Sequence, residues 1–339
     1  MNKFKKLFAG LVIAGTIVGC GDTSTNIVPQ AKDSKDGVSE KPKDVQTFKP
    51  KVDILFVIDN SGSMGAVQAN LSANAKVFAD EIAKMTLLDF HIGVITTDMQ
   101  SYYQSGKLQS DGREPVFLER TTPNLPMVLK NRILVGTGGS AYEKMFEPVI
   151  KALSPPLVNT TNLDFYRDDA YLAMIFVTDA MDQSNTITTQ QFYNFLVGKK
   201  KDYEKVLGYG VIRSQMNARA CPTEEELDGK LEGFLNMVTT GGLGQPNILS
   251  LCAPKYGQRL IEFAKDIVKR AAGTIRLNRV PDPSTIRVKY GKQEIPNSYD
   301  SGWVYENSTN SILLSPNILW ETQEGAELSV DFEAFGTDL

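Results

Sequence analysis

The chain of 339 residues has little of what enzymes commonly use for acid–base or nucleophilic catalysis. It contains one histidine, His91, and three cysteines. His91 lies inside a predicted strand and far in sequence from any candidate nucleophile, so we expect a structural imidazole rather than a general base. Neither a Gly-x-Ser-x-Gly elbow nor a His-Glu-x-x-His pair occurs. These absences argue against an enzyme, and a hydrolase that uses a metal-activated water is the catalytic alternative that remains.

The sequence also has no basic block. It carries 36 Lys and Arg against 40 Asp and Glu, a formal net charge of −4. Three of the lysines (Lys3, Lys5 and Lys6) precede the apolar run near the N-terminus, in a predicted leader without Asp or Glu. Removing that leader changes the charge from −4 to −7. A mildly acidic chain argues against nucleic acid as a partner.

No apolar run is long enough to span a bilayer. The longest run near the N-terminus, Leu7–Gly19, has 13 residues and follows a positive start, which is typical of a secretory signal. It ends in Ile17-Val18-Gly19-Cys20, which resembles a bacterial lipobox. We therefore expect residues 1–19 to be a lipoprotein signal peptide and Cys20 to carry lipid. An ordinary signal that happens to contain a cysteine is the alternative.

Export would place the other two cysteines in an oxidising compartment. There we expect Cys221 and Cys252 to form a disulfide. A two-thiol metal site is the alternative, but no histidine lies nearby to complete it. The lipid anchor implies a protein of the bacterial cell envelope, held on a membrane outside the cytoplasm, in the periplasm or at the cell surface.

After Cys20 the chain is polar and mixed in charge as far as about Pro50. Residues 20–50 cannot bury enough apolar surface to fold, so we expect a flexible tether behind the lipid.

Residues 51–280 alternate between strand and helix patterns. Four short apolar runs predict buried strands: Val52–Ile58, Phe90–Thr96, Leu172–Thr178 and Val206–Ile212. Amphipathic stripes predict helices around Leu71–Met85 and Leu260–Ala271. This alternation is typical of a doubly wound, mostly parallel sheet with helices on both faces.

Three further segments carry their own predictions. Between residues 100 and 135, Asp111-Gly112 predicts a surface hairpin. Between 213 and 256 we expect a short helix near Glu224–Met237, and a flexible loop at Gly241–Gly244 rather than a phosphate cradle. In residues 281–339 the spacing of apolar residues changes to two, which predicts a small antiparallel β module.

The segment Val52–Met64 carries the strongest chemical signal. A buried strand ends on Asp59, and Ser61 and Ser63 follow at intervals of two. One carboxylate and two hydroxyls around one point are ligands for a hard divalent cation, with too little charge to saturate it. A capping turn at a helix start is the alternative.

Two other segments join this one in a resemblance to the von Willebrand factor A family. Asp59-Asn60-Ser61-Gly62-Ser63 is similar to the family's metal-ion-dependent adhesion site. Gly136-Thr137-Gly138-Gly139-Ser140 matches the place of the family's metal-binding threonine, and Ile175-Phe176-Val177-Thr178-Asp179 matches the strand that ends in its second aspartate. The likeness covers roughly residues 51–273. More narrowly, the chain resembles exported bacterial lipoproteins that carry this domain.

The resemblance implies a role for each matched residue. Ser61 and Ser63 would bind the cation directly, Thr137 directly when a ligand is bound, and Asp59 and Asp179 mostly through water. The cation would be Mg²⁺, with Mn²⁺ or Ca²⁺ as alternatives. Thr121 and Thr122 compete with Thr137 for its role, and Thr137 is preferred because it directly precedes a predicted helical stretch with Met145 and Val149. Asp182 competes with Asp179.

Taken together, these features predict a membrane-anchored binding or adhesion lipoprotein. It would capture an Asp or Glu carboxylate of a protein partner through the cation. The alternatives are an envelope-assembly lipoprotein whose metal is only structural, and a metal-dependent hydrolase.

Overall fold

The computed structural model describes residues 43–112, 115–214, 229–238, 247–253, 255–321, 323 and 325–338. The predicted leader, Cys20 and most of the tether lie outside this part, as do the glycines of 241–244 and Cys221. The lipid anchor and the Cys221–Cys252 pairing therefore stay predictions. Within the described residues, no helix combines the length and the apolar character needed to cross a membrane.

The larger part of the described chain is built around a five-stranded parallel sheet. Its strand order is β3-β2-β4-β5-β6. The strands are β2 Lys51–Ile58, β3 Asp89–Thr96, β4 Tyr171–Val177, β5 Val206–Ile212 and β6 Ile248–Ser250. β2 is buried almost throughout, as expected for a strand covered on both faces. The first four strands confirm the predicted ones to within a residue at either end.

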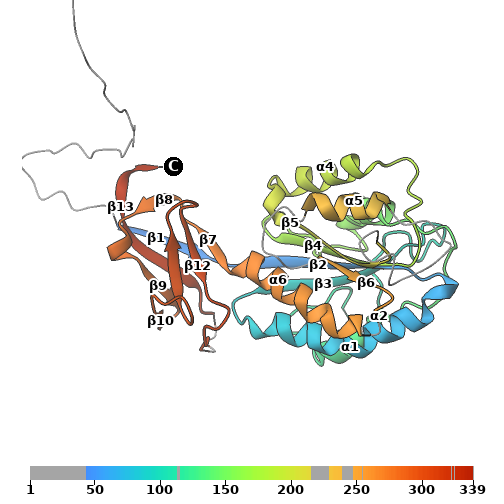
Figure 1. The fold of residues 1–339 in the computed structure, drawn as a ribbon, viewed down its shortest axis with the longest axis horizontal. Coiled ribbons are helices and arrows are strands. Elements are labelled where there is room, and N and C mark those ends of the chain that lie inside the picture. The colour runs from blue at the N-terminus through green and yellow to red at the C-terminus, as the bar shows by residue number, and fades with distance from the viewer. Residues whose placement is uncertain are drawn as a thin grey trace, which may run out of the picture. The chain divides into compact units, whose positions relative to one another are not determined.

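Helices cover both faces of this sheet (Figure 1). On one face lie α1 Gly65–Lys84, α2 Leu125–Ile133 and α6 Leu260–Ala272, which pack on Ile54 and Phe56 of β2. On the other lie α3 Phe146–Ala152, α4 Thr189–Lys200 and α5 Gly229–Val238, which pack on Leu55 and Val57. Alternate residues of one strand thus serve two separate cores, which confirms the doubly wound α/β fold.

The remaining strands form two antiparallel sheets around a third core. One has the order β1-β13-β9-β10, with β8 also paired to β13, and the other has the order β11-β12-β7. Their bounds are β1 Lys43–Phe48, β7 Thr274–Arg276, β8 Arg279–Pro281, β9 Arg287–Tyr290, β10 Gln293–Ile295, β11 Trp303–Glu306, β12 Ser311–Leu314 and β13 Leu328–Asp338. The predicted C-terminal β module is present.

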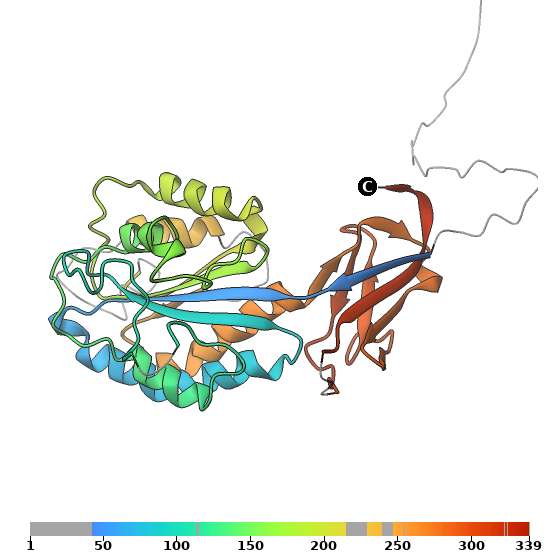
Figure 2. The same cartoon turned by 180° about the vertical axis from the view of Figure 1, so that it is seen from behind.

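Its boundaries differ from the predicted ones. Lys43–Phe48, placed in the tether by sequence, is strand β1 and pairs with Leu328–Glu333 of β13. Figure 2 shows β1, in blue, alongside β13, in red. β7 and β8 also begin before residue 281. The module is therefore built from two separated segments of the chain.

The predicted hairpin around Asp111-Gly112 is wrong. In the described residues between 100 and 135 no strand is assigned, and α2 occupies 125–133. The two stretches expected to pair with each other lie along the free edge of β3 instead. Leu118 exchanges backbone hydrogen bonds of 2.7 and 2.8 Å with Ile92, and Gln109 N donates to Val94 O at 2.8 Å. An exposed strand edge offered better partners than a local turn.

Candidate metal site

The carboxyl ends of β2 and β4 bring two of the predicted residues together. The two strands pair in parallel, with Ile58 opposite Val177. Asp59 N continues the ladder to Val177 O at 2.9 Å, which places Asp59 beside Thr178 and next to Asp179. Parallel strands end at the same edge of the sheet. The pairing register of β2 and β4 therefore also brings Asp59 close to Asp179.

Asp59 is buried and held by neighbouring donors. Ser61 N donates to its Oδ1 at 2.8 Å, and Thr178 Oγ1 donates to its Oδ2 at 2.8 Å. Burial raises the pKa of Asp59 against the effect of these hydrogen bonds, and the charge of Asp179 adds to the rise. The ionised carboxylate is therefore costly without a cation nearby.

The two serines and Asp179 form a continuous row of oxygens. The hydroxyls of Ser61 and Ser63 lie 3.2 Å apart, and Ser63 Oγ donates to Asp179 Oδ1 at 3.1 Å. Ser63 is exposed and Asp179 half-buried. The row therefore reaches from buried Ser61 to the solvent, where a hydrated ion can enter.

The loop of residues 134–145 between α2 and α3, the Thr137 loop, is hydrogen-bonded to the segment that follows β2. Gln68 of α1 donates from Nε2 to Asp59 O at 2.9 Å and to Gly136 O at 2.7 Å. Gly139 N donates to Asn60 O at 2.8 Å. Thr137 itself is exposed, and its methyl carbon lies 3.6 Å from where a Cβ on Gly65 would stand, at the start of α1.

The alternatives to Thr137 lie elsewhere. Thr122 Oγ1 accepts a hydrogen bond from Glu119 N at 2.9 Å, and Thr121 Oγ1 donates to the Glu119 carboxylate. Both hydroxyls are therefore hydrogen-bonded to Glu119 within the turn before α2. Thr137 does not directly precede a helix as expected, since α3 begins only at Phe146.

Asp182 has a structural task of its own. Its Oδ1 accepts from Met145 N at 2.7 Å, at the start of α3, and its Oδ2 pairs with Lys230 Nζ at 2.7 Å. With both oxygens engaged in this way, Asp182 is a poorer candidate ligand than Asp179.

Sequence reasoning missed Glu143, which lies in the Thr137 loop. Glu143 is 5% exposed, and its carboxyl interacts with the side chain of Ser61. Burial raises the pKa of Glu143, and the charges of Asp59 and Asp179 raise it further. No spacing signal marks this residue, because the contact depends on how the loop folds back.

The donor set suits a hard divalent cation. Within the described residues no three His, Cys, Asp or Glu side chains gather closely enough to cage a metal. The oxygens that do meet are two hydroxyls with aspartates behind them. That set fits an ion that keeps several of its waters, as Mg²⁺ does. Ser61, Ser63 and Thr137 would hold such an ion, with Asp59 and Asp179 acting through water.

His91 lies far from this site. Its Nδ1 is 2.9 Å from Phe165 O and 3.8 Å from Asp53 Oδ1. Asp53 also pairs with Arg167 Nε at 2.8 Å and lies 3.6 Å from Lys200 Nζ. Asp53 precedes Asp59 by six residues along β2, about 20 Å in a strand. The predicted structural role of His91 agrees with this buried ion cluster.

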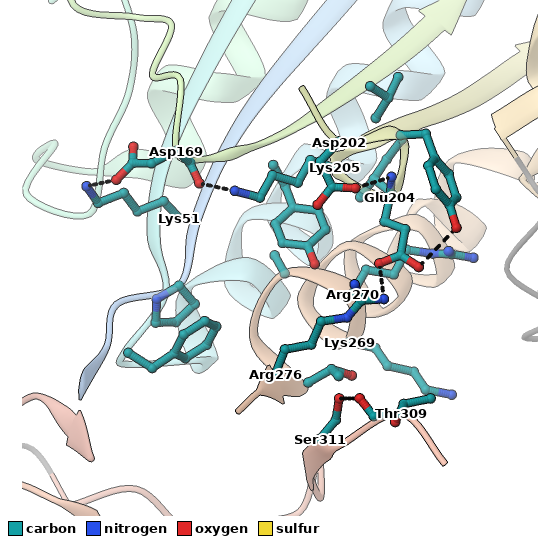
Figure 3. Close-up of a pocket in the computed structure, with 18 of the residues that line it drawn as sticks. Lys51, Asp169, Asp202, Glu204, Lys205, Lys269, Arg270, Arg276, Thr309 and Ser311 are labelled. Atoms are coloured by element: carbon teal, nitrogen blue, oxygen red, sulfur yellow. Dashed lines mark hydrogen bonds and ion pairs between the residues drawn. The ribbon is translucent and has the colours of Figure 1, made fainter. Parts of the chain in front are cut away.

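A hollow of about 690 Å³ lies at the opposite, amino-terminal end of the strands (Figure 3). Its charges largely pair with one another: Lys51 Nζ with Asp169 Oδ2 at 2.6 Å, and Arg276 with Glu204 Oε2 at 2.6 Å. Charged side chains that pair with one another are less available to bind a ligand. This hollow is therefore a weaker candidate binding site than the loops at the carboxyl ends of the strands.

Comparisons with known proteins give neighbours in structure only. No family model matches the chain, and no curated protein matches it. A von Willebrand factor type A protein from Catenulispora acidiphila is 16% identical, with a TM-score of 0.39, and covers 88% of this chain. The pilus adhesin SpaC from Lactobacillus rhamnosus GG, in an open conformation, is 12% identical, with a TM-score of 0.41 over 85% of this chain.

Proximal thread matrix protein 1 from the mussel byssus, with a zinc-occupied MIDAS motif, is 13% identical, with a TM-score of 0.35 over 66% of this chain. The chain spans 61%, 39% and 48% of these three structures, less than two thirds of each. At such identities and scores these neighbours carry no argument, and the doubly wound α/β fold of this chain rests on its own strand order and its covering helices.

Proposed function

We propose that this chain is a membrane-anchored binding lipoprotein of the bacterial cell envelope. Through a divalent cation at Ser61, Ser63 and Thr137, it captures an acidic group of a protein partner. The observation that carries the proposal is the row of oxygens from Ser61 through Ser63 to Asp179. Ser63 and Asp179, 116 residues apart in sequence, follow two different strands and meet in this row.

The chemistry follows from how the cation would be held. Hydroxyls and waters donate less negative charge than carboxylates, so the bound ion stays electrophilic. A carboxylate from a partner is then a better ligand than another water. The exposure of Ser63 and Thr137 leaves that side of the ion accessible. Mg²⁺ is the cation this donor set suits best, with Mn²⁺ and Ca²⁺ as weaker alternatives.

The anchor and the tether complete the proposal. Lipid on Cys20 would hold the chain on a membrane, and the polar segment that follows would let the folded part stand away from it. An acidic chain without a basic block suits a protein partner rather than nucleic acid. Binding rather than catalysis is proposed because the one histidine of the chain, His91, lies far from the site and is hydrogen-bonded elsewhere.

The proposal is tested by capture from a cell-envelope extract on the immobilised chain without its lipid. With Mg²⁺ present we expect a bound protein that EDTA elutes and that Asp59→Ala no longer retains. Asp300→Ala, which removes an exposed carboxylate in the β module, is the matched control and should retain it. Capture that survives both EDTA and Asp59→Ala unchanged would contradict the proposal.

One outcome would favour a structural role for the metal instead. The Gln68 bridge and the hydroxyl row already tie the loops together. If EDTA lowers the melting temperature while capture stays intact, the ion only holds these loops, and the chain is better described as an envelope-assembly lipoprotein.

A further inference from the structure

The segments at the carboxyl ends of the strands share a surface without exposed charge. We call it the uncharged face, and it is formed by residues 59–64, 97–107, 134–145 and 178–188. In these segments every Asp, Glu and Lys side chain is buried or half-buried, although 22% of the whole chain is charged. Charged residues are depleted at the centres of protein–protein interfaces, where Tyr and Met are enriched.

Large side chains are exposed on three of the four segments. Tyr102 and Tyr103 are 77% and 81% exposed, Tyr142 is 63% exposed and Met181 is 38% exposed. Lys107 Nζ lies 3.5 Å from the centre of the Tyr102 ring, so this lysine is drawn onto the aromatic surface. A group of large side chains left in water on one face is typical of a surface that another molecule covers.

Hydrogen bonds hold Tyr103 near the candidate metal site. Asn60, the residue after Asp59, donates from Nδ2 to Gln104 Oε1 at 2.7 Å. Thr96 Oγ1 donates to the same oxygen at 2.6 Å. Gln104 is the chain neighbour of Tyr103, so the tyrosine is one residue away from a side chain that contacts the segment after β2.

Tyr142 and Met181 lie at the same edge of the sheet. Tyr142 N donates to Ser140 Oγ at 2.9 Å, and Ser140 N donates to Asp98 Oδ2 at 3.2 Å, two residues beyond the end of β3. Met181 is two residues beyond Asp179, which ends the row of oxygens. The exposed side chains thus belong to the segments that adjoin this row.

We propose that the uncharged face docks a protein segment in which an Asp or Glu is flanked by large apolar side chains. The inference rests on the proposed function and describes its partner more closely. The bound cation would be the charge that this face presents, and it would pair with one carboxylate. A further charge beside that carboxylate would lose water without meeting a countercharge, which is unfavourable. Apolar flanking side chains would pack on the tyrosines instead.

Two synthetic peptides of equal length and charge test the inference. One has Phe on both sides of a central Glu, and the other has Ser in both places. Calorimetric titration of the full chain with Mg²⁺ gives their affinities. We expect the Phe-flanked peptide to bind about tenfold more tightly, because buried aromatic side chains carry much of the binding energy of an interface. EDTA, or Gln in place of the central Glu, should abolish binding.

Tyr103→Ser and Tyr142→Ser separate the uncharged face from the cation. Each variant should bind the Phe-flanked peptide about fivefold more weakly, with unchanged affinities for the Ser-flanked peptide and for Mn²⁺. Tyr299→Ser is the matched control, since Tyr299 is 84% exposed but lies in the β module, and it should match wild type. Equal affinities of wild type for the two peptides overturn the inference, as does an equal loss in Tyr299→Ser.

Other occupants of the face give different results. If sedimentation shows a dimer that Tyr142→Ser dissociates, the face binds a second copy of the chain, and the inference is overturned. Binding of a polysaccharide such as dextran that depends on Tyr142, with equal affinities for the two peptides, overturns it as well.

The failure of this inference is distinguishable from that of the proposed function. If both Glu peptides require Mg²⁺ but bind with equal affinity, only the apolar flanks of the partner are overturned. If both bind as well in EDTA as in Mg²⁺, capture through a cation is contradicted.

Discussion

Single residues at the strand ends decide whether the candidate site exists. Asp59 depends on hydrogen bonds from Ser61 N and Thr178 Oγ1, and the loop after it is pressed against the Thr137 loop. That close approach depends on Gly139. A Cβ there would stand 2.3 Å from Asn60 Cγ and Oδ1, whereas a Cβ on the neighbouring Gly138 would meet nothing within 4 Å.

Gly139→Ala should therefore push the two loops apart. We expect it to lower the free energy of unfolding by about 2 kcal/mol, the usual cost of overpacking. Mn²⁺ affinity should fall in parallel, since Thr137 is carried by the displaced loop. Urea unfolding and Mn²⁺ titration measure the two effects. Gly138→Ala is the control, and equal behaviour of the two variants would show that the loops do not need this contact.

Much of the site could be predicted at this scale, because the chemistry is local. Asp59, Ser61 and Ser63 follow one strand, and Asp179 ends a second apolar run, so each is visible as a pattern. Glu143 and Gln68 are not. They act through a loop that folds back and through one face of α1, and no spacing along the chain records either contact.

Whole elements were predictable where a buried strand is visible in the sequence as a run of apolar residues. The four buried strands of the parallel sheet are continuous apolar runs and were found. β1 was not, because Lys43–Phe48 holds only two large apolar residues, Val45 and Phe48, and Val45 is 62% exposed. Its stability comes from β13, about 285 residues further along. A half-exposed edge strand with a remote partner is indistinguishable from a tether by composition alone.

Removal of β1 should therefore weaken the β module. A chain that begins at Lys41 keeps the strand, and one that begins at Lys49 lacks it. We expect the shorter chain to lose about 3 kcal/mol of stability in the module, since the hydrogen bonds of a six-residue edge ladder are lost and each is worth roughly 0.5 kcal/mol.

Tryptophan fluorescence follows this transition, because Trp303 is buried in the core of the β module and Trp320 packs against that core. The midpoint of urea unfolding followed in this way should drop for the shorter chain only. Coincident midpoints for the two chains would show that β1 adds nothing to the module.

At the scale of the whole molecule, the proposed anchor and the proposed site lie on different parts of the chain. Lipid attachment at Cys20 is a sequence prediction outside the described residues. Cys20→Ser should move the protein from the membrane fraction to the soluble fraction on ultracentrifugation, without changing Mn²⁺ affinity. A variant that still sediments with membranes would contradict a lipid anchor at this residue.

The central claim is that one divalent cation binds where the loops after β2 and β4 meet the Thr137 loop. Anomalous diffraction from crystals grown with Mn²⁺ tests it most directly. We predict one strong anomalous peak in contact with the hydroxyl oxygens of Ser61 and Ser63, with Asp59 and Asp179 behind it, and no such peak in Asp59→Ala. Full Mn²⁺ occupancy elsewhere, with no peak beside the two serines, would contradict the account.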